Sequence, residues 1–470
     1  MTLPKLPNVG VIWLWAVLGC VLLGAGCKTT RSFVGTPAPG RPEGSLWKVG
    51  SPIVWYMQGP GAGGENSIWG DGHTAIRPAD AGPPTFEFIS PAVARKLADG
   101  GFNLMFVRNL EDLDSAHAHG MRGMLYVHEG EPPWRNVLHT DALDDPKWPA
   151  KLDALIDKVK DHPAMYGYIS VDEPGAGEFP ALGRLVDYVR KRDPKHMFYV
   201  NLFPTYASPA AQGTSGDKVT AYREYLRRFI DEVKPDLISY DHYHMRYTSR
   251  AYDNSEYFLN LALVREACVK GSIPFMNVVQ ASSMGPGWRQ PTGEEGRFLA
   301  FTTLAYGGQG ICQFVYNANE RAEHWGGVEY PDRTLTRFGK DLKEIHPEFV
   351  AVGEQLQPLT SLGVYHLGTG ELPKGGVELP NHTDFTVAPP VAADKAKGIL
   401  LGYFGSADDL THVLVVNLNY INAVTTTIVG PGPMEVFDAT ERIWHAASGD
   451  RSRAQVSLLP GGGKLVRLRE

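Results

Sequence analysis

The sequence predicts a (β/α)8 TIM barrel followed by a C-terminal antiparallel β-sandwich. Across residues 46–355, short apolar runs alternate with polar or Gly/Pro-rich loops and with segments of helical periodicity, the pattern of parallel βα units. After residue 355 the helix-length segments stop, and short strands separated by turn residues take their place. We therefore expect two folded parts, residues 46–355 and residues 356–470.

The first 27 residues have the composition of a secretory signal. Lys5 precedes an apolar stretch over residues 9–26, which ends in small residues before Cys27. Residues 23–27 resemble the lipobox of bacterial lipoproteins, which implies lipidation of Cys27. Cys20 is a second candidate, and an uncleaved membrane anchor is the alternative. With residues 28–45 as a flexible tether, either reading predicts an exported protein held at the cell envelope, periplasmic or at the cell surface.

Eight apolar runs are expected to form the barrel strands. They are residues 52–57, 102–107, 121–127, 165–171, 197–202, 236–240, 274–279 and 310–315. The clearest intervening helix covers residues 179–192, where Phe179, Leu182 and Val186 fall on one face. A last helix over residues 335–354 closes the barrel.

The second part is predicted from short strands alone. They cover residues 399–404, 413–418, 424–429, 434–437 and 456–458, and apolar and basic residues alternate over residues 466–469. Residues 368–397 are too long and proline-rich for a simple hairpin, and we assign them no element.

The overall composition is that of a globular protein, with 43% hydrophobic and 21% charged residues. A formal net charge of -7 gives nucleic acids no reason to bind. No cofactor motif is present in the sequence.

Polar side chains follow the predicted strands, and in a parallel barrel these strand ends converge on one rim. The candidates, in chain order, are Arg108, His128, Glu129, Asp172, Glu173, Asn201, Asp241, His242, Tyr243, Gln280 and Tyr316. A barrel that serves only as a scaffold does not need this many. Trp134 and Trp325 also fall in rim loops, where an aromatic face can stack on an apolar face of a ligand.

The strand that ends in Asp172-Glu173-Pro174 resembles the fourth strand of the large retaining clan of (β/α)8 glycoside hydrolases, which includes β-galactosidases, β-mannanases and cellulases. Residues 297–310 and the trailing β-domain are also similar to β-galactosidase-like members. The resemblance implies that Glu173 is the general acid/base and that the substrate is a carbohydrate. The alternative is that Glu173 pairs with Arg108 and only fixes the barrel rim.

The sequence departs from the clan at strand seven, where the resemblance implies a nucleophilic glutamate and this chain has Gln280. An amide does not attack an anomeric carbon as a carboxylate does. Asp241 is the first candidate for the second carboxylate, and Glu129 is the next. Their distance from Glu173 decides the mechanism, because about 5 to 5.5 Å suits retention and about 6.5 to 9.5 Å suits inversion.

Strand alternation turns Asp172 away from Glu173, so we expect it to accept a hydrogen bond at the rim. His242 and His244 beside Asp241 offer a weak metal-binding pattern, and hydrogen bonds to sugar hydroxyls explain them more simply. We therefore assign no metal.

Three hypotheses follow from these residues. The first is an exported glycoside hydrolase that cleaves a poly- or oligosaccharide. The second is a surface lipoprotein that binds glycan on a degenerate hydrolase barrel without cleaving it. The third is a metal-dependent hydrolase that uses Asp241, His242 and His244.

Overall fold

The computed structural model describes ten segments of the chain. They are residues 49–57, 91–129, 136–246, 256–284, 287–316, 326–330, 334–388, 398–406, 409–447 and 452–469. The expected signal, the tether and Cys27 lie outside these residues. Within the described segments, no helix combines the length and apolar character needed to cross a bilayer.

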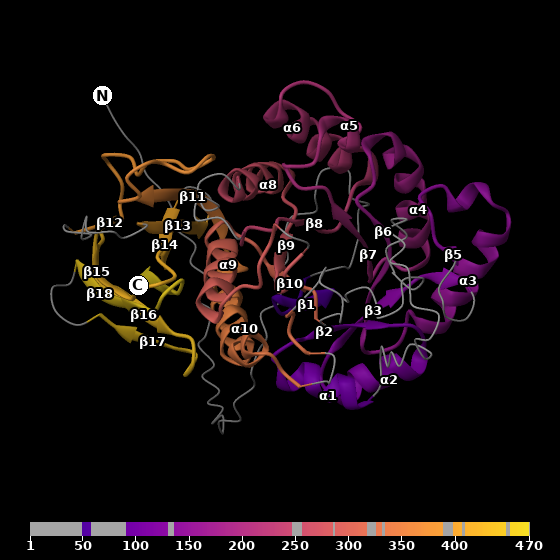
Figure 1. The fold of residues 1–470 in the computed structure, drawn as a ribbon, viewed down its shortest axis with the longest axis horizontal. Coiled ribbons are helices and arrows are strands. Elements are labelled where there is room, and N and C mark those ends of the chain that lie inside the picture. Colours follow the sequence, from indigo (N-terminus) through magenta and orange to yellow (C-terminus); the bar gives the residue numbers. More distant parts are fainter. Residues whose placement is uncertain are drawn as a thin grey trace, which may run out of the picture. The chain divides into compact units, whose positions relative to one another are not determined.

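Parallel strands form the barrel, as predicted (Figure 1). They are β1 (Ile53–Met57), β2 (Leu104–Val107), β3 (Arg122–Tyr126), β6 (Met165–Asp172), β7 (Met197–Leu202), β8 (Ile238–Asp241), β9 (Phe275–Gln280) and β10 (Gly310–Phe314). Their order in the sheet is β1-β10-β9-β8-β7-β6-β3-β2. A short hairpin of β4 (His128–Glu129) and β5 (Asn136–Val137) follows β3. All eight predicted barrel strands are therefore present in the described residues.

Helices lie outside the ring of strands (Figure 1). They are α1 (Pro91–Asp99), α2 (Leu110–Ala118), α3 (Lys147–Val159), α4 (Phe179–Arg192), α5 (Pro209–Gln212), α6 (Lys218–Arg228), α8 (Tyr257–Gly271), α9 (Gly293–Ala305) and α10 (Arg337–Leu356). Two short 3₁₀ helices are η1 (Ala142–Asp144) and η2 (Ala176–Glu178), and a π-helical segment, η3 (Phe229–Val233), continues from α6. Helix α4 has the bounds that its apolar periodicity predicts, and it buries Phe179, Leu182 and Val186.

Aromatic side chains fill the barrel interior. Trp55 of β1 contacts Phe106 of β2 and Tyr199 of β7, with ring centroids 4.6 and 5.0 Å away. Because β7 lies across the barrel from β1, these contacts identify the faces of the strands that point inward. Residues two positions further along β7 face the same way.

The barrel closes between β1 and β2 through a side chain. The backbone N–H of Asn103 donates to the carbonyl of Val54 at 3.0 Å, and Asn103 Oδ1 accepts from the N–H of Val54 at 2.9 Å. Asn103 Nδ2 donates to the carbonyl of Pro52, and the guanidinium of Arg122 donates to Asn103 Oδ1, both at 2.7 Å. The hydrogen bonds of one asparagine thus replace a ladder of backbone hydrogen bonds between β1 and β2, and we call this junction the seam.

We expect Asn103→Ala to lower the free energy of unfolding by about 2–4 kcal/mol, because it leaves the Val54 N–H without its acceptor and removes one of the acceptors of the Arg122 guanidinium. Urea denaturation followed by circular dichroism measures the change. Asn422→Ala, at an exposed position of the β-domain, is the matched control. A loss no larger than that of the control contradicts this account of the seam.

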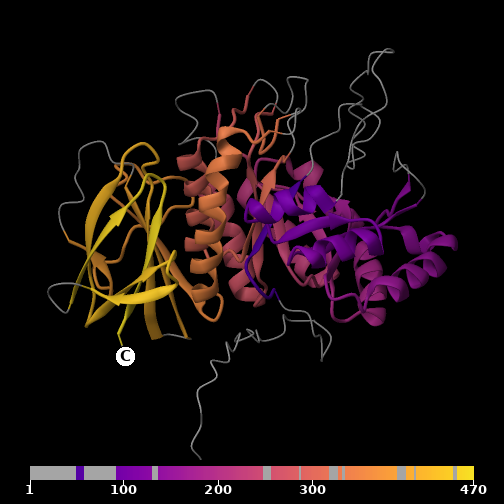
Figure 2. The same cartoon turned by 90° about the horizontal axis from the view of Figure 1, so that it is seen from below.

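The C-terminal part is a β-sandwich, as predicted (Figure 2). One sheet contains β11 (Thr360–Leu367), β13 (Ile399–Ser406), β14 (Asp409–Asn417), β19 (Gly463–Leu468), β16 (Met434–Asp438) and β17 (Ile443–Ala446). The other contains β12 (Thr386–Val387), β15 (Val424–Val429) and β18 (Arg453–Leu458). Its core includes Phe385, which lies in the stretch to which the sequence pattern assigns no element.

Candidate active site

Strand β6 carries a bulge just before its carboxyl end. Its register with β7 shifts between Ile169 and Val171, so Ser170 is an extra residue and Asp172 pairs with Asn201. Paired residues of parallel neighbours face the same side of a sheet, and Asn201 faces the barrel interior, two positions after Tyr199. Simple alternation turns Asp172 away from the site, whereas the bulge re-aims it. The exposed Asp172 therefore lies at the barrel mouth.

Glu173 follows β6 with a backbone φ of 44°, a left-handed conformation that is uncommon for a residue with a side chain. Its N–H donates to the carbonyl of Asn201 at 2.9 Å. The hydroxyl of Tyr225 donates to the carbonyl of Pro174 at 2.7 Å. The proline also disfavours helical geometry for Glu173. The chain thus leaves the sheet at Glu173, and its half-buried side chain remains at the mouth.

Asp241 is the last residue of β8 and is 4% exposed. Its Oδ1 accepts from Asn201 Nδ2 at 3.0 Å, and its Oδ2 accepts from the Tyr206 hydroxyl at 3.3 Å. The carboxyl of Glu173 also hydrogen-bonds to it. The Ser239 hydroxyl donates to Asn201 Oδ1 at 3.2 Å, which fixes the orientation of the amide. The structure therefore brings the predicted residues Glu173, Asp241 and Asn201 into one network.

Glu173 holds a proton in this network. Burial, followed by the charges of Asp241 and Asp172, raises the pKa of Glu173 well above the ordinary range of a carboxyl. Burial also raises the pKa of Asp241, although hydrogen bonds from Glu173, Asn201 and Tyr206 act in the opposite direction. At neutral pH the two carboxyls consequently share one proton, which Glu173 donates to Asp241.

The contact between Glu173 and Asp241 is a direct hydrogen bond. The carboxyls of a retaining hydrolase lie about 5 to 5.5 Å apart, and those of an inverting one about 6.5 to 9.5 Å apart. A directly bonded pair leaves no space between its members for a sugar carbon or for an attacking water.

Two tyrosines, Tyr206 after β7 and Tyr243 after β8, also lie at the barrel mouth. Tyr206 is partly exposed, and its ring packs 5.0 Å from that of His242. Burial, with the charges of Asp241 and Glu173, raises the pKa of Tyr206 well above its usual value, so its hydroxyl stays a donor. Tyr243, a predicted site residue, has a similarly raised pKa for the same reasons, burial first. Tyr206 is recognisable in the sequence only as a polar side chain after β7, since its loop has no motif.

Gln280 ends β9 and is fully buried. Its Oε1 accepts from the N–H of Met245 at 2.8 Å. Its Nε2 donates to the carbonyls of Met245, Ser282 and Arg289 at 3.0, 3.2 and 2.6 Å. The amide therefore clamps the loops that follow β8 and β9, a role that a carboxylate, which has no donor, does not fill.

The two histidines after β8 are enclosed by protein. His242 is 0% exposed, and its Nδ1 lies 2.9 Å from Asn260 Oδ1. The ring of His244, which is 2% exposed, lies 4.9 Å from that of Tyr257 and 5.8 Å from that of Phe298. Both imidazoles therefore lie in the protein interior.

Two further predicted residues have structural partners. Arg108 donates to both carboxylate oxygens of Asp112, at 2.8 and 3.1 Å. Tyr316 is 3% exposed and packs against the rings of Tyr56 and Phe102.

The remaining candidates are described only in part. His128 and Glu129 form strand β4, in which Glu129 pairs with Asn136, but their side chains lie outside the described residues. Trp134 and Trp325 also lie outside them.

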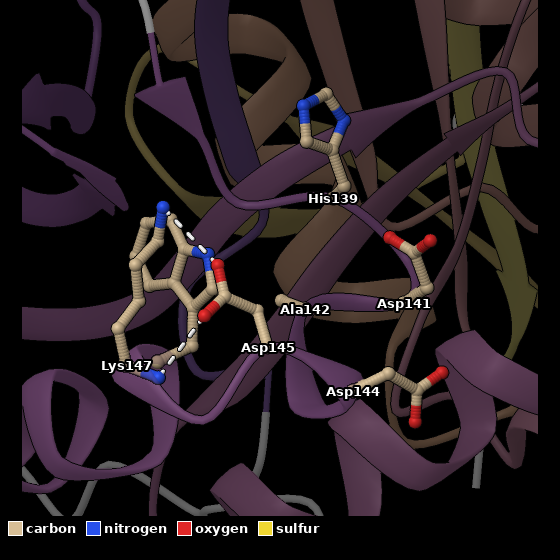
Figure 3. Close-up of a pocket in the computed structure, with 7 residues that line it drawn as sticks. His139, Asp141, Ala142, Asp144, Asp145 and Lys147 are labelled. Carbon is tan, nitrogen blue, oxygen red and sulfur yellow. Dashed lines mark hydrogen bonds and ion pairs between the residues drawn. The ribbon is translucent and has the colours of Figure 1, made fainter.

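A pocket of about 350 Å³ lies between β5 and α3 (Figure 3). It is lined by His139, Asp141, Ala142, Asp144, Asp145, Lys147 and Trp148. The neighbouring Thr140 hydroxyl donates to Glu178 Oε1 at 3.1 Å, and Glu178 Oε2 accepts from the N–H of Gly175 at 2.9 Å. The pocket loop is thus tied to the turn that follows Glu173.

Solved structures share this architecture. A glycoside hydrolase family 5 protein from Bacteroides vulgatus is 11% identical, with a TM-score of 0.51 over 93% of each chain. The fold is that of the (β/α)8 glycoside hydrolases. A catalytic mutant of a family 42 β-galactosidase from G. stearothermophilus is 9% identical, with a TM-score of 0.52 over 89% of this chain and 98% of that one.

A β-galactosidase from the psychrophilic Marinomonas ef1 is 11% identical, with a TM-score of 0.43 over 56% of this chain. The present chain spans only 58% of that protein. No protein-family model matches the sequence, and no curated protein does.

Proposed function

We propose that this protein hydrolyses O-glycosidic bonds of an oligo- or polysaccharide, with Glu173 as the general acid. The observation that carries the proposal is the half-buried Glu173 carboxyl at the barrel mouth, hydrogen-bonded to the buried Asp241. A general acid must hold its proton at the working pH, and this pair favours protonated Glu173. The glycoside hydrolase fold, and neighbours described as glycoside hydrolases, give further support.

The proposed reaction begins with transfer of the Glu173 proton to the glycosidic oxygen. The bond from this oxygen to the anomeric carbon breaks as positive charge develops on the sugar ring. Asp241, Asn201 and Tyr206 hold the Glu173 carboxyl in place through the network described above. The partly exposed rings of Tyr206 and Tyr243 offer the sugar apolar faces and hydroxyl groups.

The test compares the wild-type protein with Glu173→Gln on nitrophenyl glycosides of galactose, mannose, glucose and xylose and on matching oligosaccharides. We expect the wild type to release product, and Glu173→Gln to lose most of the activity on the oligosaccharide. Glu266→Gln, on the exposed face of α8, keeps full activity as the matched control. Wild-type protein that binds oligosaccharides but releases no product supports the glycan-binding alternative and refutes the hydrolase.

We also propose that the protein is exported and anchored in the cell envelope through a lipid on Cys27. The support is the apolar stretch before Cys27 and its resemblance to a lipobox. In a bacterial host fed a labelled fatty acid, the wild type is expected to take up label, and Cys27→Ser is expected to take up none. Label that persists in Cys27→Ser but disappears in Cys20→Ser moves the anchor to Cys20.

A further inference from the structure

A glycosidase needs a group that faces the positive charge developing on the anomeric carbon, and two obvious candidates are already engaged. Gln280 is uncharged, fully buried and bound to four backbone groups. Asp241 is 4% exposed and accepts from Asn201 and Tyr206 while bonded to Glu173. A sugar carbon has no access to either side chain in this arrangement.

Asp172 differs from both in its exposure. The bulge at Ser170 turns it to the inward face beside Asn201, and the side chain is exposed at the barrel mouth. Its charge contributes to the raised pKa of Glu173, after burial and Asp241. It also reaches Tyr126 of β3, whose pKa is raised by burial and then by Asp172. Asp172 is therefore a carboxylate at the mouth of the barrel, within electrostatic reach of two neighbouring strands.

We propose that Asp172 is the second catalytic carboxylate, the one that faces the anomeric carbon. This inference rests on the proposed function and names the partner of Glu173 within the same site. Asp241 then has a different role, that of a positioning residue that keeps the proton on Glu173.

The reaction balances with these three groups. Glu173 gives its proton to the leaving oxygen, which departs with the electron pair of the broken carbon–oxygen bond. The Asp172 carboxylate stabilises the resulting positive charge on the sugar. A water oxygen then bonds to the anomeric carbon, and one water proton returns to Glu173. Glu173 ends the cycle protonated and Asp172 ends it ionised, so no further reactant is needed.

Substrates with different leaving groups distinguish the roles proposed for Glu173, Asp172 and Asp241. A dinitrophenyl leaving group departs without a proton, so Glu173→Gln should lose far less activity on a dinitrophenyl glycoside than on the corresponding oligosaccharide. Asp172→Asn should lose about 10²- to 10³-fold in kcat on both substrates, because charge at the anomeric carbon develops with either. In Asp241→Asn, oligosaccharide activity should decline at a lower pH than in the wild type, because the substitution removes a charge that raises the pKa of Glu173.

These measurements distinguish failure of this inference from failure of the proposed function. If Asp172→Asn keeps dinitrophenyl activity within about threefold of the wild type while Glu173→Gln loses oligosaccharide cleavage, the role of Asp172 is refuted and the hydrolase stands. If wild-type protein cleaves none of these glycosides, the hydrolase and the Asp172 assignment both fall. Circular dichroism and Tm verify folding, and Asp172→Ser is the second variant, which should behave as Asp172→Asn does.

Discussion

Replacement of Glu173 by glutamine is expected to lower kcat on an oligosaccharide by about 10²- to 10⁴-fold, the usual contribution of general acid catalysis. Glutamine keeps the size of the side chain and a donor toward Asp241, but it has no proton to give to a leaving oxygen. Initial rates across a pH series measure the loss. Activity within about tenfold of the wild type at every pH contradicts the assignment.

The pH dependence of wild-type kcat/KM also tests whether Glu173 is the general acid. Because burial and the charges of Asp241 and Asp172 raise the pKa of Glu173, kcat/KM should hold through neutral pH and fall on the alkaline side as Glu173 loses its proton. The groups that face Glu173 also include the hydroxyls of Tyr206 and Tyr243. The pH at which kcat/KM falls gives the apparent pKa of the hydrogen-bonded network around Glu173, not the pKa of one residue. In Glu173→Gln this alkaline fall should disappear.

The free energy of unfolding should also depend on pH through Glu173. Glu173 binds its proton more tightly in the folded chain than in the unfolded chain, whose carboxyl titrates near 4.5. The folded state therefore gains from this group fully below about pH 4.5 and loses that gain as the pH rises toward the raised pKa. Glu173→Gln does not titrate, so its Tm relative to the wild type should rise with pH, by on the order of 2 °C at pH 8. A Tm difference that is independent of pH contradicts a buried, protonated Glu173.

The ring of strands was predictable because each strand is a run of buried apolar residues flanked by turn residues, as in residues 197–202. Periodicity also predicted α4, because its apolar side chains recur on one face. The position of Glu173 at the barrel rim was predictable for a similar reason, since the proline after it ends an apolar run.

The remaining features of the site come from contacts that leave no local pattern. The bulge at Ser170 inserts one residue into an apolar strand without changing its hydrophobic character, so simple alternation places Asp172 on the wrong side. The burial of His242 depends on Asn260, which lies 18 positions along the chain. The three backbone carbonyls around Gln280 are brought together only by the tertiary fold.

Gln280→Glu tests whether strand β9 ends in a lost nucleophile or in a structural clamp. We expect the substitution to lower the free energy of unfolding by about 2–5 kcal/mol and to give no gain in activity. The new carboxylate would face the carbonyls of Met245, Ser282 and Arg289, all of which are acceptors. Protonation would relieve the repulsion but restore only one donor.

Gln455→Glu makes the same chemical change at an exposed position of β18 and should leave the unfolding free energy nearly unchanged. Denaturant titration of both variants, with rates on a dinitrophenyl glycoside, measures the contrast. A stable Gln280→Glu variant with raised activity would mean that residue 280 reaches the anomeric carbon. The clamp would then be a by-product of a degenerate active site. A destabilised variant with no new activity means instead that the amide holds the loop after β8, and therefore the position of Tyr243, in place beside Glu173.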